Sequence, residues 1–100
     1  MKKFIIASGI IAISTASISA YAYSGEKLAK QARIDIDHAR AIALKAFPGK
    51  ITDEELEKES GGSGLRYSFD IKQNNIEQEV GVDAITGKVL ENRREEQNAD

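Results

Sequence analysis

The 100-residue chain contains no cysteine and no tryptophan, and it has one histidine and one proline. Without cysteine there is no disulfide, no thiolate metal site and no cysteine nucleophile. A single histidine, His38, excludes a histidine-rich metal centre. Residues 23–100 hold 12 Lys and Arg against 16 Asp and Glu, so their net charge is −4. This balance argues against nucleic-acid binding, which needs an excess of basic side chains.

The first 22 residues have the three parts of a secretory signal peptide. A basic start, Lys2 and Lys3, precedes an uncharged apolar run over residues 4–18, and the small residues Ala20 and Ala22 follow. This pattern predicts cleavage after Ala22. The alternative is an uncleaved anchor, but the run is shorter than the ~20 residues that span a membrane and contains several Ser and Thr. We expect a periplasmic or secreted product with no stable membrane insertion after cleavage.

The rest of the chain divides into three parts by composition. Residues 23–33 are polar and are expected to be a flexible lead-in with helical tendency near Glu26–Gln31. Residues 34–91 are expected to form one small domain. Residues 92–100 contain one apolar residue, Ala99, and are expected to be a disordered polar tail.

A helix is predicted from Asp35 to about Phe47. Asp35 is a suitable N-cap because its carboxylate can accept hydrogen bonds from the free amides of the first turn. Pro48 and Gly49 end the segment. Apolar residues recur at helical spacing in between, namely Ile36, Ala39, Ile42, Ala43, Ala46 and Phe47.

Beyond Gly49 the apolar period changes to two, which is typical of strands. Residues 50–58 predict a strand with a bulge, because Ile51 and Leu56 are out of phase. Residues 65–72 and 76–82 alternate regularly, and a short strand begins at residues 88–90. One helix followed by three or four antiparallel strands predicts a two-layer α+β unit.

The segment Asp83-Ala84-Ile85-Thr86-Gly87 is interpreted as a structural turn rather than a ligand-binding loop. Asp83 can bond the backbone ahead of it, and Gly87 can adopt a positive φ. Thr86 belongs to the same turn chemistry.

The order of these features resembles the PepSY domain family, which occurs in propeptides of thermolysin-like metallopeptidases and in bacterial envelope proteins. The residues that carry the resemblance are Ile34–Ala43, Pro48–Lys50, Leu56–Glu59, Tyr67–Ile71 and Val82–Leu90. The resemblance implies a helix on an antiparallel sheet, no catalytic residues, and a regulatory or inhibitory role toward peptidases. No peptidase follows within these 100 residues, so we expect any inhibition to act in trans.

The most distinctive local charge is the acidic run that contains Asp53, Glu54, Glu55 and Glu57. One interpretation is a contact surface for a basic partner. The other is a charged edge strand that discourages sheet-to-sheet aggregation. The two interpretations are compatible.

No enzyme, cofactor or metal site is expected. Asp35, Asp37 and His38 are a poor chelate at a helix start, where Asp35 is needed as a cap. Ser68 and His38 have no evident reason to meet in a triad.

Two functions follow as hypotheses: a non-enzymatic inhibitor or modulator of an exported peptidase, or an envelope binding or sensory accessory module with no peptidase target. Inhibition through a sheet edge is expected to fail when proline replaces an outward strand residue such as Ser68. The sequence leaves the partner's identity and the oligomeric state open.

Overall fold

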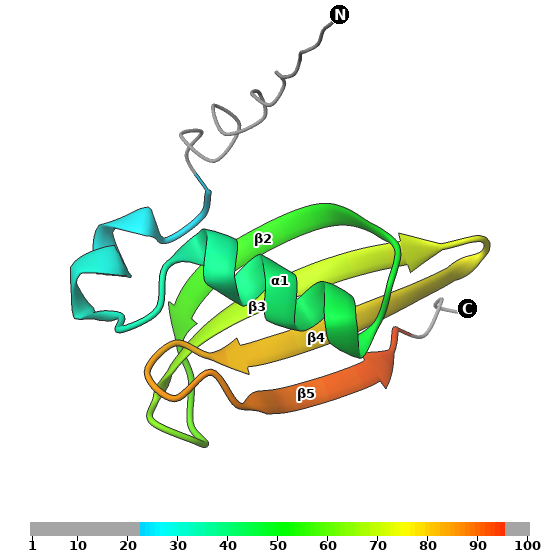
Figure 1. Ribbon diagram of the computed structural model, residues 1–100. Coiled ribbons are helices and arrows are strands. Elements are labelled where there is room, and N and C mark those ends of the chain that lie inside the picture. The colour runs from blue at the N-terminus through cyan, green and yellow to red at the C-terminus, as the bar shows by residue number, and fades with distance from the viewer. Residues whose placement is uncertain (1–22, 96–100) are drawn as a thin grey trace, which may run out of the picture.

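The computed structural model describes residues 23–95 of the chain. Four strands form one antiparallel sheet in the order β2-β3-β4-β5, and α1 lies across one face of it (Figure 1). The predicted α+β fold is therefore confirmed. The elements are η3 (Glu26–Gln31), α1 (Ile36–Ala46), β2 (Lys50–Lys58), β3 (Leu65–Gln73), β4 (Ile76–Asp83) and β5 (Val89–Arg94).

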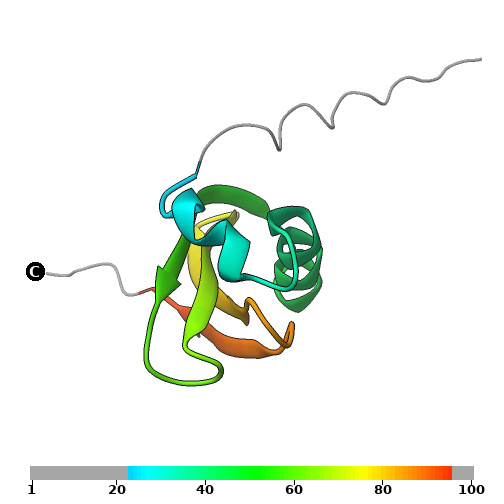
Figure 2. The ribbon, with the colours of Figure 1, turned by 90° about the vertical axis from the view of Figure 1, so that its left-hand side faces the viewer.

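The molecule has two layers, as the view turned by 90° shows (Figure 2). The α1 helix covers one face of a curved sheet, and the opposite face carries no helix among the described residues. We call this uncovered side the open face. The side chains that point from the sheet toward α1 form the core, and those that alternate with them lie on the open face.

Helix α1 begins where the sequence predicts. The Asp35 carboxylate accepts a hydrogen bond from the His38 amide at 2.9 Å. The buried residues Ile36, Ala39 and Ala43 form its inner side, and the two alanines allow the helix to approach the sheet closely. The helix ends at Ala46, just before Pro48.

The core lies between α1 and the sheet. The strands β2, β3 and β4 contribute the side chains that are almost completely buried: Leu56, Tyr67, Phe69, Ile71, Val80 and Val82. Tyr67 and Phe69 stack with their ring centroids 6.4 Å apart. This set matches the alternation in the sequence, because each residue is two positions from the next along its strand.

The predicted bulge in β2 is confirmed. The register with β3 shifts between Ile51 and Asp53. The extra residue shifts the alternation of side chains by one position. Ile51 and Leu56 therefore both pack against the core, although they are five positions apart and would lie on opposite faces of a regular strand.

The N-terminal segment, expected as a flexible lead-in, packs on the outer edge of β2. Ser24 forms a parallel bridge with Glu55, and its carbonyl accepts a hydrogen bond from the Leu56 amide at 2.8 Å. The helical tendency expected near Glu26–Gln31 corresponds to η3. The lead-in contributes to the fold because it satisfies part of an otherwise unpaired strand edge.

The expected tail boundary after residue 91 is wrong by three residues, because β5 continues to Arg94. Asn92 lies opposite Val80 and Arg93 lies opposite Glu79 in the ladder. Backbone pairing needs no apolar side chain, which is why the polar composition was misleading.

The predicted signal peptide, with Ala20 and Ala22, lies outside the described residues, as does the tail beyond residue 95. Within residues 23–95, no helix combines the length and the apolar character needed to cross a membrane.

Candidate protein-binding surface

The acidic run is divided between the two faces of β2. Leu56 is buried in the core, so Glu55 and Glu57, which alternate with it along β2, lie on the open face. Glu54 lies on the α1 side, where its two carboxylate oxygens accept hydrogen bonds from Arg40 Nε and Nη2, both at 2.9 Å. This hydrogen bonding raises the pKa of the Arg40 guanidinium. Of the four candidate contact residues, Glu54 is therefore occupied in holding α1 to β2.

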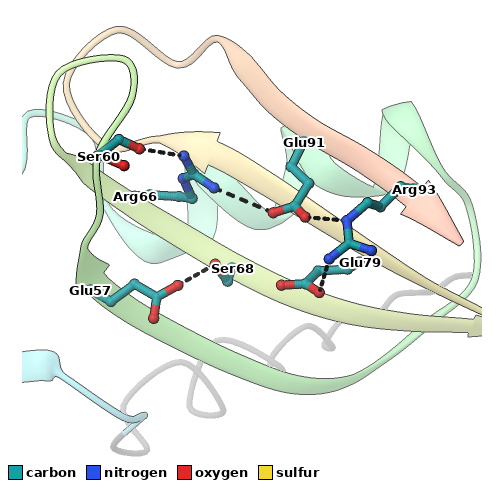
Figure 3. Close-up of polar contacts among 7 residues, drawn as sticks. All are labelled: Glu57, Ser60, Arg66, Ser68, Glu79, Glu91 and Arg93. Atoms are coloured by element: carbon teal, nitrogen blue, oxygen red, sulfur yellow. Dashed lines mark hydrogen bonds and ion pairs between the residues drawn. The ribbon is translucent and has the colours of Figure 1, made fainter. Parts of the chain in front are cut away.

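The other three candidates remain available from the open side. Asp53 is exposed, Glu55 is half-buried, and Glu57 accepts a hydrogen bond from Ser68 Oγ at 2.8 Å (Figure 3). The charge of Glu57, together with burial, raises the pKa of the Glu55 carboxyl. Carboxylates crowded in this way repel one another, and a cationic partner would relieve the repulsion.

A chain of ion pairs crosses the open face farther along (Figure 3). Arg66 donates to Glu91 at 3.3 Å and to the Ser60 carbonyl at 3.2 Å. Glu91 also pairs with Arg93 at 2.6 Å, and Arg93 lies 3.8 Å from Glu79. These pairs connect β3, β4 and β5 on the side away from α1.

Three carboxylates that the sequence analysis did not single out gather on the same face. One oxygen from each of Asp70, Glu77 and Glu95 lies within 4.8 Å of the others. Burial, followed by the charge of Glu95, raises the pKa of Asp70. The alternation of side chains along β3 and β4 places Asp70 and Glu77 on one face. The position of Glu95 beside them could not be predicted, because it depends on the extension of β5 past residue 91. Exposed acidic groups often gather without an ion, and we assign no metal here.

The open face is therefore predominantly negative. Basic side chains on it are Lys50, Arg66, Lys72 and Arg93. The acidic ones are Asp53, Glu55, Glu57, Asp70, Glu77, Glu79, Glu91 and Glu95. Several of these acids already have basic partners, but those on β2 have none among the described residues.

Asp83 is the centre of the predicted turn and is almost fully buried. Its oxygens accept hydrogen bonds from the Ser63 amide (2.7 Å), Ser63 Oγ (2.8 Å), the Ile85 amide (2.8 Å) and the Thr86 amide (3.1 Å). Burial alone would raise the pKa of Asp83, but these hydrogen bonds more than offset it and lower the pKa to about 2. One carboxylate thus ties the β2–β3 loop to the β4–β5 turn.

The other polar groups of the turn bond within the turn itself. Gly87 has a φ of 81°, in the left-handed region that favours glycine, and its amide donates to the Asp83 carbonyl at 2.9 Å. Thr86 Oγ1 accepts from the Lys88 amide at 3.2 Å. These groups therefore hold the backbone of the turn in place.

Comparison with known families agrees with this architecture. Residues 33–93 match the PepSY family, described as "Peptidase propeptide and YPEB domain". The chain belongs to the PepSY family. The matched residues include α1, the strands β2, β3 and β4, and β5 up to Arg93 of this PepSY domain. Comparison with curated proteins and with solved structures finds no significant match.

The groups weighed for catalysis lie apart in this PepSY domain. Ser68 is on the open face and donates to Glu57, whereas His38 is on α1, on the other side of the sheet. Asp35 caps α1, and Asp37 pairs with Arg40. Neither a triad nor a chelate forms among these residues.

Ser68 is also unsuitable for testing an edge. It belongs to β3, which pairs with β2 on one side and with β4 on the other. Its side chain lies on the open face, but the residue is only 8% exposed. A proline there would disrupt the interior of the sheet, so the outer sides of β2 and β5 are the proper positions for such a test.

Two open hollows flank Tyr23. One is lined by Ser24 and residues 51–54, and the other includes Arg33 and Tyr67. The Tyr67 hydroxyl donates to the Ile34 carbonyl at 2.8 Å, and burial raises its pKa. A neutral phenol committed to a backbone carbonyl anchors the segment before α1 and is not free to act on a ligand.

Proposed function

We propose that this protein is exported and non-catalytic, and that it inhibits or modulates an exported peptidase by binding it. The observation that carries the proposal is membership of a propeptide-type family together with a compact α+β domain over the matched residues. The separation of Ser68 from His38 supports a binding role over a hydrolytic one.

The proposed contact is the β2 side of the open face, formed by Asp53, Glu55 and Glu57. These carboxylates have no basic partner among the described residues, and the raised pKa of Glu55 indicates repulsion between them. A partner with Lys or Arg side chains would fit this surface. Glu54 is not part of the proposed contact, because Arg40 holds it on the other side of the strand.

Export is proposed from the N-terminal pattern. The protein recovered after export should begin at Tyr23, two residues before Gly25, where the segment already packs on β2. N-terminal sequencing of that protein tests this directly. A chain that keeps residues 1–22 would contradict the cleavage site.

The binding proposal is tested by crosslinking capture from the native envelope fraction, with the exported protein as bait. A captured peptidase should then bind the pure protein directly. We expect Glu55→Gln, and more strongly Glu55→Gln with Glu57→Gln, to weaken this binding. The control is Glu26→Gln on η3, which removes the same charge from an exposed residue away from the open face.

The dependence of binding affinity on salt concentration distinguishes an acidic contact surface from an apolar one. If the acidic surface mediates binding, affinity should fall as ionic strength rises through the physiological range, where the screening length is ~8–10 Å. Capture of a sensor, transporter or assembly factor without any peptidase would instead support the envelope-accessory function. If binding does not depend on salt and is unchanged in Glu55→Gln and in the double variant, the acidic surface is not the contact for a peptidase or for any other envelope partner.

A further inference from the structure

The two edges of the sheet differ in how they are protected. β2 carries a bulge and an acidic run, and Ser24 covers part of its outer side. β5 carries no proline, and no described segment pairs with its outer side. Val89, the one large apolar residue that is exposed in residues 23–95, lies on β5. An unguarded edge of this kind is a template for another strand.

The backbone direction on β5 follows from its pairing with β4. The Glu95 amide donates to the Glu77 carbonyl at 2.8 Å, and Arg93 lies opposite Glu79 in the same register. In an antiparallel ladder, alternate residues direct their N–H and C=O to the same neighbour. Asn92 and Arg94 therefore direct these groups outward, away from the sheet.

The charges on β5 indicate that the strand pairing with its outer edge is β5 of a second copy of the same chain. If two β5 strands pair antiparallel about a twofold axis at Asn92, Glu91 of each copy lies opposite the partner's Arg93, and this pairing occurs twice. A shift of two residues in one direction places Glu91 opposite Glu91, and a shift in the other direction places Arg93 opposite Arg93. Of these three registers, only the one centred on Asn92 pairs opposite charges.

We propose that this protein forms a twofold dimer by antiparallel pairing of β5 with β5, centred on Asn92, which joins two four-stranded sheets into one. The outward N–H and C=O of Asn92 then bond to those of the partner's Asn92. The interface is isologous, as a closed dimer requires. Because one strand from each copy forms it, the interface is small and the dimer is expected to be weak and concentration-dependent. The acidic residues of β2 lie at the opposite edge and stay free.

Disulfide trapping tests the register, because the natural chain has no cysteine. In Asn92→Cys, the two introduced residues face each other in a hydrogen-bonded pair, whose Cα separation of ~5.5 Å suits a disulfide. In the control Arg94→Cys, an equally exposed residue of the same strand, the two thiols lie about 13 Å apart along the strands. Under mild oxidation, Asn92→Cys should form the covalent dimer about tenfold faster or more.

Sedimentation equilibrium tests the edge without a cysteine. The wild-type chain should show a monomer–dimer equilibrium that Asn92→Pro removes, since proline lacks the outward N–H and tolerates an edge position. Lys58→Pro, at an exposed position on β2, should leave the equilibrium unchanged. Arg93→Glu should weaken the dimer, since it places like charges opposite one another. Circular dichroism confirms that each variant remains folded.

Three results would overturn the proposal: a wild-type chain that stays monomeric at all concentrations, equal trapping of Asn92→Cys and Arg94→Cys, or a dimer that Asn92→Pro leaves intact. A monomer whose binding to a peptidase is lost in Asn92→Pro would also overturn it, and would assign the β5 edge to that partner instead.

Discussion

Arg66 on β3 and Glu91 on β5 form an ion pair at 3.3 Å across the strand that separates them. The pair is possible because Gly81, between them on β4, has no side chain. A Cβ at that position would lie 3.0 Å from Arg66 Cδ and 3.3 Å from Glu91 Cβ. The open face is thus organised around a glycine that permits a long side chain to lie flat over the sheet.

Gly81→Ala should therefore destabilise the domain by about 1–3 kcal/mol through overpacking, because the Arg66 stem must move. Urea unfolding followed by circular dichroism measures the change. Gly81→Ala combined with Arg66→Ala is the control, since removing the arginine should recover part of the loss. A single variant as stable as the wild type would contradict the contact.

Asp83→Asn should lower the free energy of unfolding by about 1.5–3 kcal/mol, because the amide cannot accept all the hydrogen bonds that the carboxylate accepts. The effect should also depend on pH. The pKa of Asp83 is about 2 in the folded chain against 3.8 for the ordinary group. Its contribution is complete above pH ~4 and is lost as the pH falls toward 2, where protonation removes the charge.

Unfolding of the wild type and Asp83→Asn between pH 7 and pH 2 separates these effects. The difference in stability between the two proteins should be largest at neutral pH and should shrink below pH ~4. A difference that stays constant down to pH 2 would show that the charge of Asp83 is not what holds the loop and turn together.

Gly25→Ala should release the N-terminal segment from β2. Gly25 has a φ of 81°, and a Cβ there would run into the Leu56 carbonyl. The expected result is a large increase in hydrogen exchange at the Leu56 amide, whose acceptor is the Ser24 carbonyl. Exchange at core amides of β3 should stay close to that of the wild type. Unchanged protection at Leu56 would contradict the edge pairing.

Glu54→Gln and Glu55→Gln should behave in opposite ways although the residues are adjacent. Glu54→Gln breaks the ion pair with Arg40 and should cost about 1 kcal/mol of stability while leaving partner binding unchanged. Glu55→Gln relieves repulsion from Glu57 and should stabilise the fold slightly, by up to about 0.5 kcal/mol, while weakening partner binding. Thermal unfolding measures the stability of each variant, and a binding isotherm measures its affinity for the partner. Equal effects of the two variants on binding would contradict the division of the acidic run.

The helix, the strands β3 and β4 and the bulge in β2 could be predicted because apolar residues there follow a clear period. The last part of β5 could not, because Asn92, Arg93 and Arg94 contribute backbone pairing and charge rather than apolar side chains. The packing of Ser24 on β2 was missed for the same reason.

The candidate surface was predictable only in part. The acidic run stands out in the sequence, but its division between two faces depends on Arg40, which reaches Glu54 from 14 residues away. The link between Ser63 and Asp83 likewise joins segments 20 residues apart. Such contacts depend on how the layers pack, which local spacing does not encode.

The function that we propose for this PepSY protein is modulation of an exported peptidase. The most direct test is the rate of the captured peptidase on a peptide substrate as the pure exported protein is titrated to saturation of binding. We expect a saturable change in rate, which is a decrease if the protein is an inhibitor. The Glu55→Gln variant should require higher protein concentrations for this change than the Glu26→Gln variant. A rate that stays constant while binding saturates would contradict it.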